Sequence, residues 1–63
     1  MIQFNLLIPT KEIDEILSRD DEKFIIITRT QWMMNHTYFI IEAEETEMCY
    51  FVLKYGQTHV WKR

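Results

Sequence analysis

Three segments of this chain carry apolar residues at consecutive positions rather than at alternating ones: 24–27, 38–41 and 48–53. A half-solvated strand alternates apolar and polar side chains, so continuous apolar runs of this length predict strands that are buried on both faces. Each such strand needs a covering layer on both sides. The pattern therefore predicts more apolar sheet surface than a short chain can cover by itself.

The N-terminal segment predicts a strand followed by one short helix. In residues 1–8 the apolar side chains at even positions share one face, and Pro9 ends the strand because it has no N–H group to donate. Thr10 is placed to cap a helix that runs to about Arg19, and a polar turn follows at 20–22. The helix is about 15 Å long, and its apolar stripe has three members: Ile13, Ile16 and Leu17.

The remainder predicts antiparallel strands over 23–33, 37–44, 47–55 and 58–62, with turns at 35–36, 45–46 and 56–57. Two-residue turns place the following residues opposite one another: Arg29 and Glu42, Trp32 and Phe39, Met33 and Tyr38, and Ile41 and Tyr50. The more apolar face, which we expect under the helix, carries Phe24, Ile26, Trp32, Phe39, Ile41, Met48, Tyr50 and Val52. The other face is mixed, as a partner-binding surface is, and carries Ile25, Ile27, Arg29, Gln31, Met33, Tyr38, Ile40, Glu42, Cys49, Phe51 and Leu53.

The predicted fold is a single α+β domain over residues 1–63, with an N-terminal strand, one short helix and an antiparallel meander of three to four strands. A small, curled β-barrel is the alternative. Five strands at about 4.8 Å spacing make a sheet roughly 19 Å across, about twice the width of one helix. We therefore expect the uncovered apolar surface to contact a protein partner, either a second copy in a homo-oligomer or a larger protein.

Composition restricts the cellular location and the classes of function that we expect for the chain. A chain of 63 residues with one cysteine cannot form an internal disulfide, and we expect no cofactor and no metal site. The absence of a signal-like start and of an apolar run near 20 residues predicts a cytoplasmic protein without membrane association. Cys49 is expected to be a small buried core residue, and the carboxylates fall at solvated turns. We therefore predict no catalytic site and a non-enzymatic protein.

Protein recognition is the function that the sequence favours. Tryptophan and tyrosine dominate interface hot spots, and methionine adapts to irregular surfaces. The predicted interaction residues are Trp32, Met33, Met34, Tyr38, Ile40 and Phe51. A short chain of this kind is typical of a homodimer or of an inhibitor or regulator of a larger protein, such as the accessory proteins of phages and mobile elements.

A single-stranded nucleic-acid-binding module is the alternative function. Cations and aromatic rings are combined near the C-terminus, as such modules require, at Lys54, Tyr55, His59, Trp61, Lys62 and Arg63. The net charge of −3 argues against this alternative, because binding to phosphates depends on positive charge.

Overall fold

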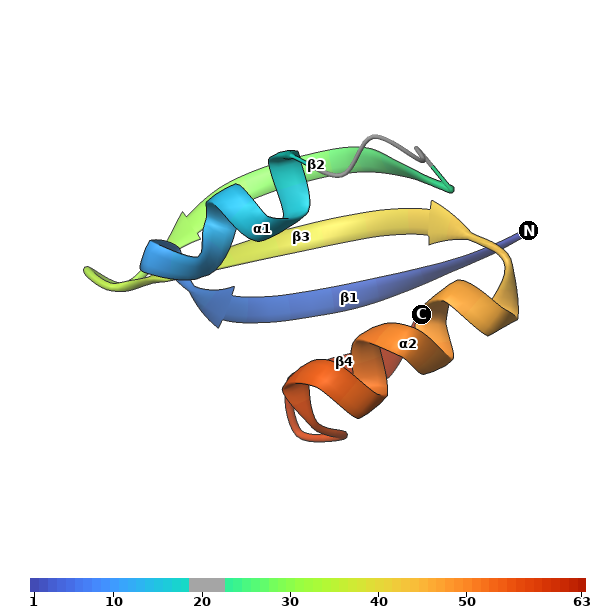
Figure 1. Ribbon diagram of the computed structural model, residues 1–63. Helices are drawn as coiled ribbons and strands as arrows, with labels where there is room; N and C mark the ends of the chain where they lie inside the picture. Colours follow the sequence, from blue (N-terminus) through green and yellow to red (C-terminus); the bar gives the residue numbers. More distant parts are fainter. Residues whose placement is uncertain (19–22) are drawn as a thin grey trace.

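Four antiparallel strands form one sheet in the order β2-β3-β1-β4 in the computed structural model, which describes residues 1–18 and 23–63 (Figure 1). The strands are β1 (Ile2–Pro9), β2 (Phe24–Trp32), β3 (His36–Ala43) and β4 (Val60–Lys62). A 3-10 turn, η1 (Thr10–Glu12), leads into helix α1 (Ile13–Leu17), and helix α2 (Glu45–Tyr55) connects β3 to β4. The α+β class, the N-terminal strand, the short helix and the antiparallel sheet are confirmed. The barrel alternative is wrong, because β2 and β4 are the open edges of the sheet.

Helix α2 replaces the strand that the sequence predicted over 47–55. Glu45 and Glu47 lie in its first turn and Lys54 in its last, which is the distribution that the helix dipole favours. Gly56 follows with a φ of +97° and a ψ of 155°, which is outside the helical region and which glycine adopts most readily. The predicted pairing of Ile41 with Tyr50 is therefore wrong, because Tyr50 lies on a helix.

The β2–β3 hairpin turns through three residues, 33–35, instead of the predicted two at 35–36. Met33 makes this turn possible by adopting a φ of +60°. The observed Cα partners are Trp32 and His36, Thr30 and Tyr38, Arg29 and Phe39, and Ile25 and Glu42. The predicted pairs of Arg29 with Glu42, Trp32 with Phe39 and Met33 with Tyr38 are therefore wrong. A register shift between Ile26 and Thr28, where the strand carries an extra residue, separates the two halves of the ladder.

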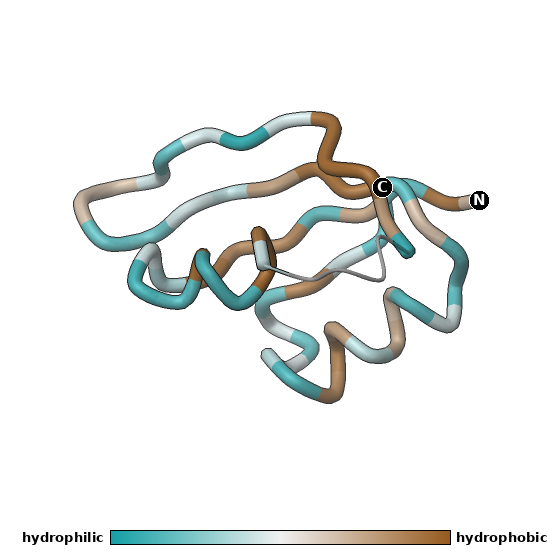
Figure 2. The backbone as a smooth tube through the Cα atoms, turned by 45° about the horizontal axis from the view of Figure 1, so that its top comes forward, coloured by the Kyte–Doolittle hydropathy of each residue, from teal (hydrophilic) through white to brown (hydrophobic). Residues whose placement is uncertain are grey.

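Both helices lie on the same side of the sheet, and the core is between them and the strands (Figure 2). The core consists of Phe4, Leu6, Ile8, Ile16, Phe39, Ile41, Ala43, Phe51 and Val60. Phe51 of α2 is its centre, with ring centroids 5.8 Å from Phe4 and 5.4 Å from Phe24. The predicted inward positions of Phe24, Ile26, Phe39 and Ile41 are confirmed, whereas Trp32 and Tyr50 are 54% and 43% exposed.

Glu15 links the two helices. Its carboxylate lies 3.2 Å from the Lys54 ammonium, and it accepts a hydrogen bond of 3.4 Å from the Tyr55 hydroxyl. The predicted end of α1 at Arg19 and the predicted turn at 20–22 lie outside the described residues. Neither α1 nor α2 is long and apolar enough to cross a membrane.

Candidate protein-interaction surface

The face of the sheet that points away from α1 and α2 has no covering element in the described part of the chain. We call it the open face. Burial alternates strictly along β3, where Thr37, Phe39, Ile41 and Ala43 are buried and the residues between them are partly exposed. Strand pairing then assigns to the open face Gln3, Asn5, Leu7, Ile25, Thr28, Thr30, Trp32, His36, Tyr38, Ile40, Glu42 and Trp61.

Each of the four strands contributes one residue to an apolar cleft on the open face. Leu7, Trp32, Tyr38 and Trp61 line this cleft, which has a volume of about 140 Å³. The rings of Tyr38 and Trp61 have centroids 6.3 Å apart and planes inclined by 41°. Trp32 remains 54% exposed and Trp61 42% exposed. The cleft can therefore accept an apolar group from outside the chain.

Asn5 holds two walls of the cleft in place from the strand between them. Its side chain is 6% exposed, and its Oδ1 accepts a hydrogen bond from the Tyr38 hydroxyl. Its Nδ2 donates to the backbone carbonyl of Trp61 at 3.5 Å. The oxygen and the nitrogen of this buried amide both make hydrogen bonds. Movement of either partner would leave a desolvated polar group without a hydrogen bond, so both partners are held in place.

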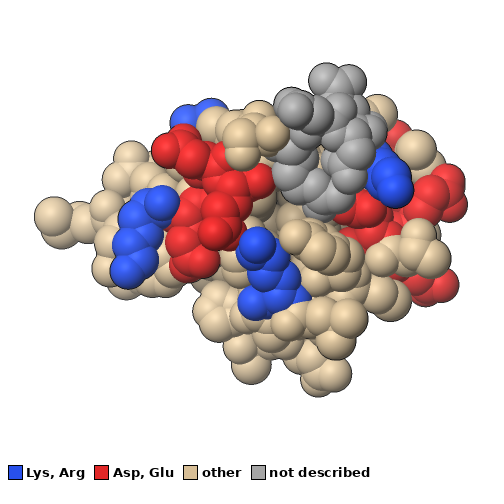
Figure 3. All heavy atoms as spheres, viewed as in Figure 1, with Lys and Arg blue, Asp and Glu red and all other residues tan. Residues whose placement is uncertain are grey.

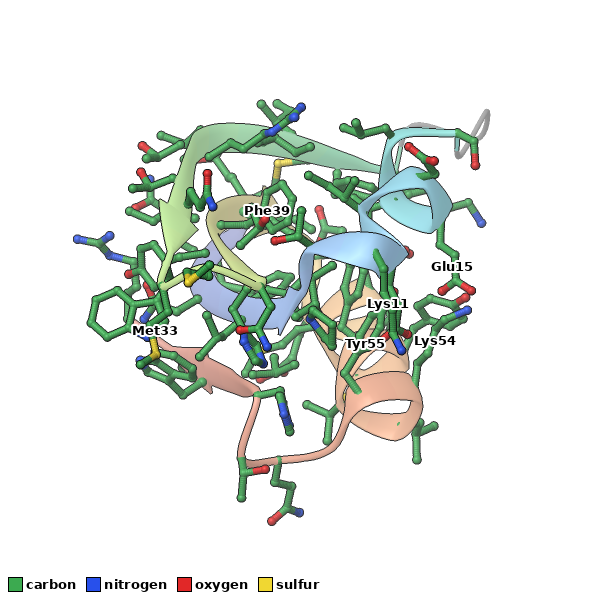
Figure 4. All side chains as sticks on the ribbon, turned by 90° about the vertical axis from the view of Figure 1, so that its left-hand side faces the viewer. Lys11, Glu15, Met33, Phe39, Lys54 and Tyr55 are labelled. Atoms are coloured by element: carbon green, nitrogen blue, oxygen red, sulfur yellow. The ribbon has the colours of Figure 1, made fainter. Side chains whose placement is uncertain are left out.

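The hairpin at the end of β2 and β3 extends the apolar surface. Met33 is 73% exposed and Met34 is 93% exposed. The Gln31 side chain donates to the carbonyls of Met33 and Met34 at 3.3 and 3.4 Å, which ties the turn to β2. Figure 4 shows Met33 far from Glu15, Lys54 and Tyr55, which lie on the helix side.

Negative charge is concentrated on the helix side of the molecule. Figure 3 shows carboxylates gathered over the region of α1 and near the start of α2. The residues concerned are Glu12, Asp14, Glu15, Glu44, Glu45 and Glu47. Among the described acidic residues, Glu42 alone lies on a strand, where it accepts a hydrogen bond of 3.3 Å from Gln3. The cleft itself has no carboxylate among its lining residues.

The structure places five of the six predicted interaction residues together. Trp32, Tyr38 and Ile40 are on the open face, and Met33 and Met34 form the adjoining turn. Phe51 does not belong with them, because it is 1% exposed in the core. Its assignment to a partner-facing surface is wrong for the same reason that the strand over 47–55 is wrong.

Sequence reasoning missed Asn5 and Leu7 as parts of this surface. Leu7 is the apolar exception on a strand face that otherwise carries Gln3 and Asn5. An apolar residue at a position that should be solvated is the signal that could have identified it.

The residues of the nucleic-acid alternative do not form one surface. Lys54 and Tyr55 belong to α2 and contact Glu15, which raises the pKa of Lys54 through a side-chain hydrogen bond. Lys62 pairs with Glu45 at 3.6 Å, whereas Trp61 faces the other side of the sheet. His59 is partly buried, with Nδ1 at 3.0 Å from the Thr58 hydroxyl, and the Arg63 amide donates to the carbonyl of Gln3.

Cys49 is exposed on α2, so its prediction as a buried core residue is wrong. The error follows from the strand assignment, which placed it in the middle of a sheet. No group of three or more His, Cys, Asp or Glu side chains is arranged to hold a metal ion within residues 1–18 and 23–63.

Comparison of the chain with protein-family models, with curated proteins and with solved structures gave no match. The geometry of the open face is therefore the basis for a functional proposal.

Proposed function

We propose that this protein is a non-enzymatic interaction module that binds another polypeptide through the open face. The observation that carries the proposal is the apolar cleft lined by Leu7, Trp32, Tyr38 and Trp61. Tryptophan and tyrosine are enriched among the residues that contribute most to binding energy. An apolar side chain of the partner inserts into the cleft, and the surrounding open face excludes water.

The size of the cleft supports a polypeptide rather than a small-molecule ligand. Pockets for drug-sized molecules and cofactors measure about 300–1,000 Å³, whereas this cleft measures about 140 Å³. That volume suits a single side chain at the centre of a broader contact. The exposed methionines of the adjoining turn supply part of that broader contact.

The strand pairing and hydrogen bonding around the cleft also support binding. Its four walls are on paired strands, and Asn5 fixes Tyr38 and the backbone of Trp61. A site that is already ordered loses little conformational entropy on association, so more of the contact energy appears as affinity.

The chemistry of the cleft supports a non-enzymatic role. Catalysis of proton or group transfer needs a nucleophile or an acid–base group in the site. The cleft is lined by two indoles, one phenol and one leucine. In this proposal the protein acts as a homodimer, or as an inhibitor or regulator docked on a larger protein in the cytoplasm.

A peptide selection tests the proposal. Random peptides displayed on phage are selected against the immobilised full chain, and the affinity of each selected peptide is measured by fluorescence anisotropy. We expect peptides with an apolar anchor whose binding weakens by about tenfold or more, equivalent to about 1.4 kcal/mol, in Trp32→Ala and in Trp61→Ala. Circular dichroism of each variant establishes that it is folded.

Leu53→Ala is the matched control for the tryptophan variants. Leu53 is 87% exposed, but it lies on α2, away from the open face. Its loss should leave peptide affinity unchanged. Peptides that depend on Leu53 and tolerate both tryptophan changes would place the binding surface on the helix layer and refute the proposal.

A salt series separates protein binding from the nucleic-acid alternative. Labelled single-stranded oligonucleotides are titrated with the wild type and with the double variant Lys62→Ala/Arg63→Ala. We expect no specific binding at physiological salt. A strong signal that falls with salt and is lost in the double variant would support the alternative instead.

A further inference from the structure

We infer that the occupant of the open face is a second copy of this chain, so that two protomers stack sheet against sheet. The inference rests on the proposed function, because it names the partner of the same surface. The resulting dimer has four layers, with the helices outside and the two sheets inside. Sheets that pack face to face in this way lie about 10 Å apart and interdigitate their side chains.

The exposed apolar area of the open face and the adjoining turn together reaches the lower limit for a stable dimer. Ile25, Trp32, Met33, Met34 and Trp61 are between 42% and 93% exposed. At roughly 200 Å² for a fully exposed large side chain, they present about 600 Å² of surface per protomer. The partly exposed Leu7, Tyr38 and Ile40 add to this area. Two such surfaces bury about 1,200 Å² or more in total, which is where specific interfaces begin.

The distribution of charge favours self-association through this face. A chain with a net charge of −3 repels its own copies wherever its carboxylates meet. Six of the described carboxylates belong to the helix layer and its start, and Glu42 is the one described carboxylate on the open face, outside the cleft. Stacking through the open faces keeps the two acidic helix layers as far apart as the molecule allows.

A twofold dimer needs a surface that is complementary to itself. The open face carries an apolar cleft and, next to it, the projecting side chains of Met33 and Met34. The methionines of one protomer can therefore contact the cleft of the other. Methionine is suited to this role because its flexible, polarizable side chain adapts to irregular gaps.

Pairing through the free edge of β2 is the main rival arrangement, and the strand is poorly suited to it. Its register shift between Ile26 and Thr28 interrupts the regular row of backbone donors and acceptors. Arg29, next to the shift, adds a charge of the kind that protects edge strands from pairing.

Sedimentation equilibrium of the full chain over a wide micromolar range tests the inference. We expect a reversible monomer–dimer equilibrium for the wild type. Met33→Glu, in the adjoining turn, and Ile25→Glu, on the open face, each add a carboxylate to the interface and should raise the dissociation constant by about thirtyfold or more, since the carboxylate must be desolvated in the dimer. Leu53→Glu adds the same charge on α2 and should leave the constant within about twofold.

Several results would overturn the inference. One is a wild type that stays monomeric at the highest concentration; another is a dimer that Leu53→Glu dissociates while Met33→Glu does not. A dimer that resists both Met33→Glu and Ile25→Glu but is lost in Ile27→Pro would establish edge pairing instead. A monomer that still binds the selected peptides through Trp32 and Trp61 refutes the dimer and leaves the proposed function standing. A monomer that binds no peptide refutes both.

Tryptophan fluorescence gives a second measurement that needs no variant. The indoles of Trp32 and Trp61 become less hydrated in the dimer, so dilution of the wild type should shift their emission to longer wavelength. The shift should occur over the same concentrations as dissociation in the centrifuge. Emission that does not change while the dimer dissociates would overturn the placement of the interface.

Discussion

Tyr38 and Trp61 lie with ring centroids 6.3 Å apart, although they belong to β3 and β4, which are separated by β1. The contact is possible because Asn5, on the strand between them, accepts a hydrogen bond from the Tyr38 hydroxyl and donates one to the Trp61 carbonyl. One buried amide on the central strand thus positions two aromatic walls of the cleft.

Asn5→Ala should lower the free energy of unfolding by about 1–3 kcal/mol, because it leaves the Tyr38 hydroxyl and a backbone carbonyl without their buried partner. Urea denaturation measures the loss. Gln3→Ala is the control, since Gln3 makes an exposed hydrogen bond on the same strand and should cost less than about 0.5 kcal/mol. Equal effects would show that Asn5 does not organise the cleft.

Phe51→Ala should destabilise the protein by about 3–5 kcal/mol, because it removes a ring that is 1% exposed and contacts aromatic residues of the sheet. A loss of this size leaves a small domain largely unfolded at room temperature, which circular dichroism detects. Leu53→Ala, two positions further along α2, should change stability by less than about 0.5 kcal/mol. If Leu53→Ala were the more damaging change, α2 would be packed through the opposite face.

Gly56→Ala should cost about 1–3 kcal/mol through the backbone alone. The φ of +97° and ψ of 155° at Gly56 lie in a region that residues with a Cβ rarely adopt. Steric overlap is not the cause, because an added Cβ would lie 3.8 Å from His59 Nδ1, which is an ordinary contact. Thermal denaturation measures the loss, and Gln57→Ala, at the next position, should be nearly neutral. A neutral Gly56→Ala would mean that the end of α2 is not built as described.

Met33→Gly should stabilise the monomer by about 0.5–1 kcal/mol. Its φ of +60° costs a residue with a Cβ about 1–2 kcal/mol, and glycine removes that cost at the expense of a more flexible unfolded chain. Met34→Gly should have the opposite sign, because Met33 is the one non-glycine residue with positive φ in the described ranges. Denaturation at low protein concentration keeps the measurement free of association. A Met33→Gly variant less stable than the wild type would contradict the turn geometry.

Stability should fall with rising pH in the alkaline range because of Tyr55. Burial, with help from the Glu15 carboxylate, raises the pKa of Tyr55 from 10.0 to about 12. The folded state therefore keeps the phenol proton where the unfolded state releases it. The corresponding contribution to stability is complete below pH 10 and is lost between pH 10 and about 12.

Tyr55→Phe tests this assignment. In the wild type, ultraviolet titration of tyrosinate absorbance should show an ionisation near pH 12, and the variant should lack it. The variant should also lose less stability between pH 10 and 12 than the wild type. An ionisation near pH 12 that persists in Tyr55→Phe would assign the raised pKa to another residue.

The parts of the fold that could be read from the sequence are those with a regular period. Phe4, Leu6 and Ile8 alternate with polar neighbours, and all three are fully buried. Phe39 and Ile41 were also placed correctly, because the more uniformly apolar of the two predicted sheet faces was assigned to the core. The prediction that apolar sheet surface remains uncovered rested on the runs 24–27, 38–41 and 48–53. The first two are on β2 and β3, whose outer side contributes to the open face, whereas the third is on α2.

The segment 48–53 was misread because a short apolar run has no period that separates a buried strand from a helix. The residues that identify this segment as a helix lie outside the apolar run. Glu45 and Glu47 precede it in the first turn of α2, Lys54 follows it in the last turn, and Gly56 comes after the helix. The error added a strand, removed a covering helix, placed Phe51 and Cys49 incorrectly and led to the wrong pairing of Ile41 with Tyr50. The cleft could not be predicted, because it depends on β1 lying between β3 and β4, and strand order is not encoded in local pattern.

The position of β1 inside the sheet also sets the order in which this protein can fold. Phe4, Asn5 and Leu6 pair on one side with Ile41, Ile40 and Phe39 and on the other with Lys62, Trp61 and Val60, so both neighbours come from much later in the sequence. The chain loses conformational entropy when these long loops close, before the strand contacts form. We therefore expect a lower folding rate than for a chain of this size with mainly local contacts. The last wall of the cleft is complete only when β4 has paired with β1, so the binding that we propose would require a fully folded chain.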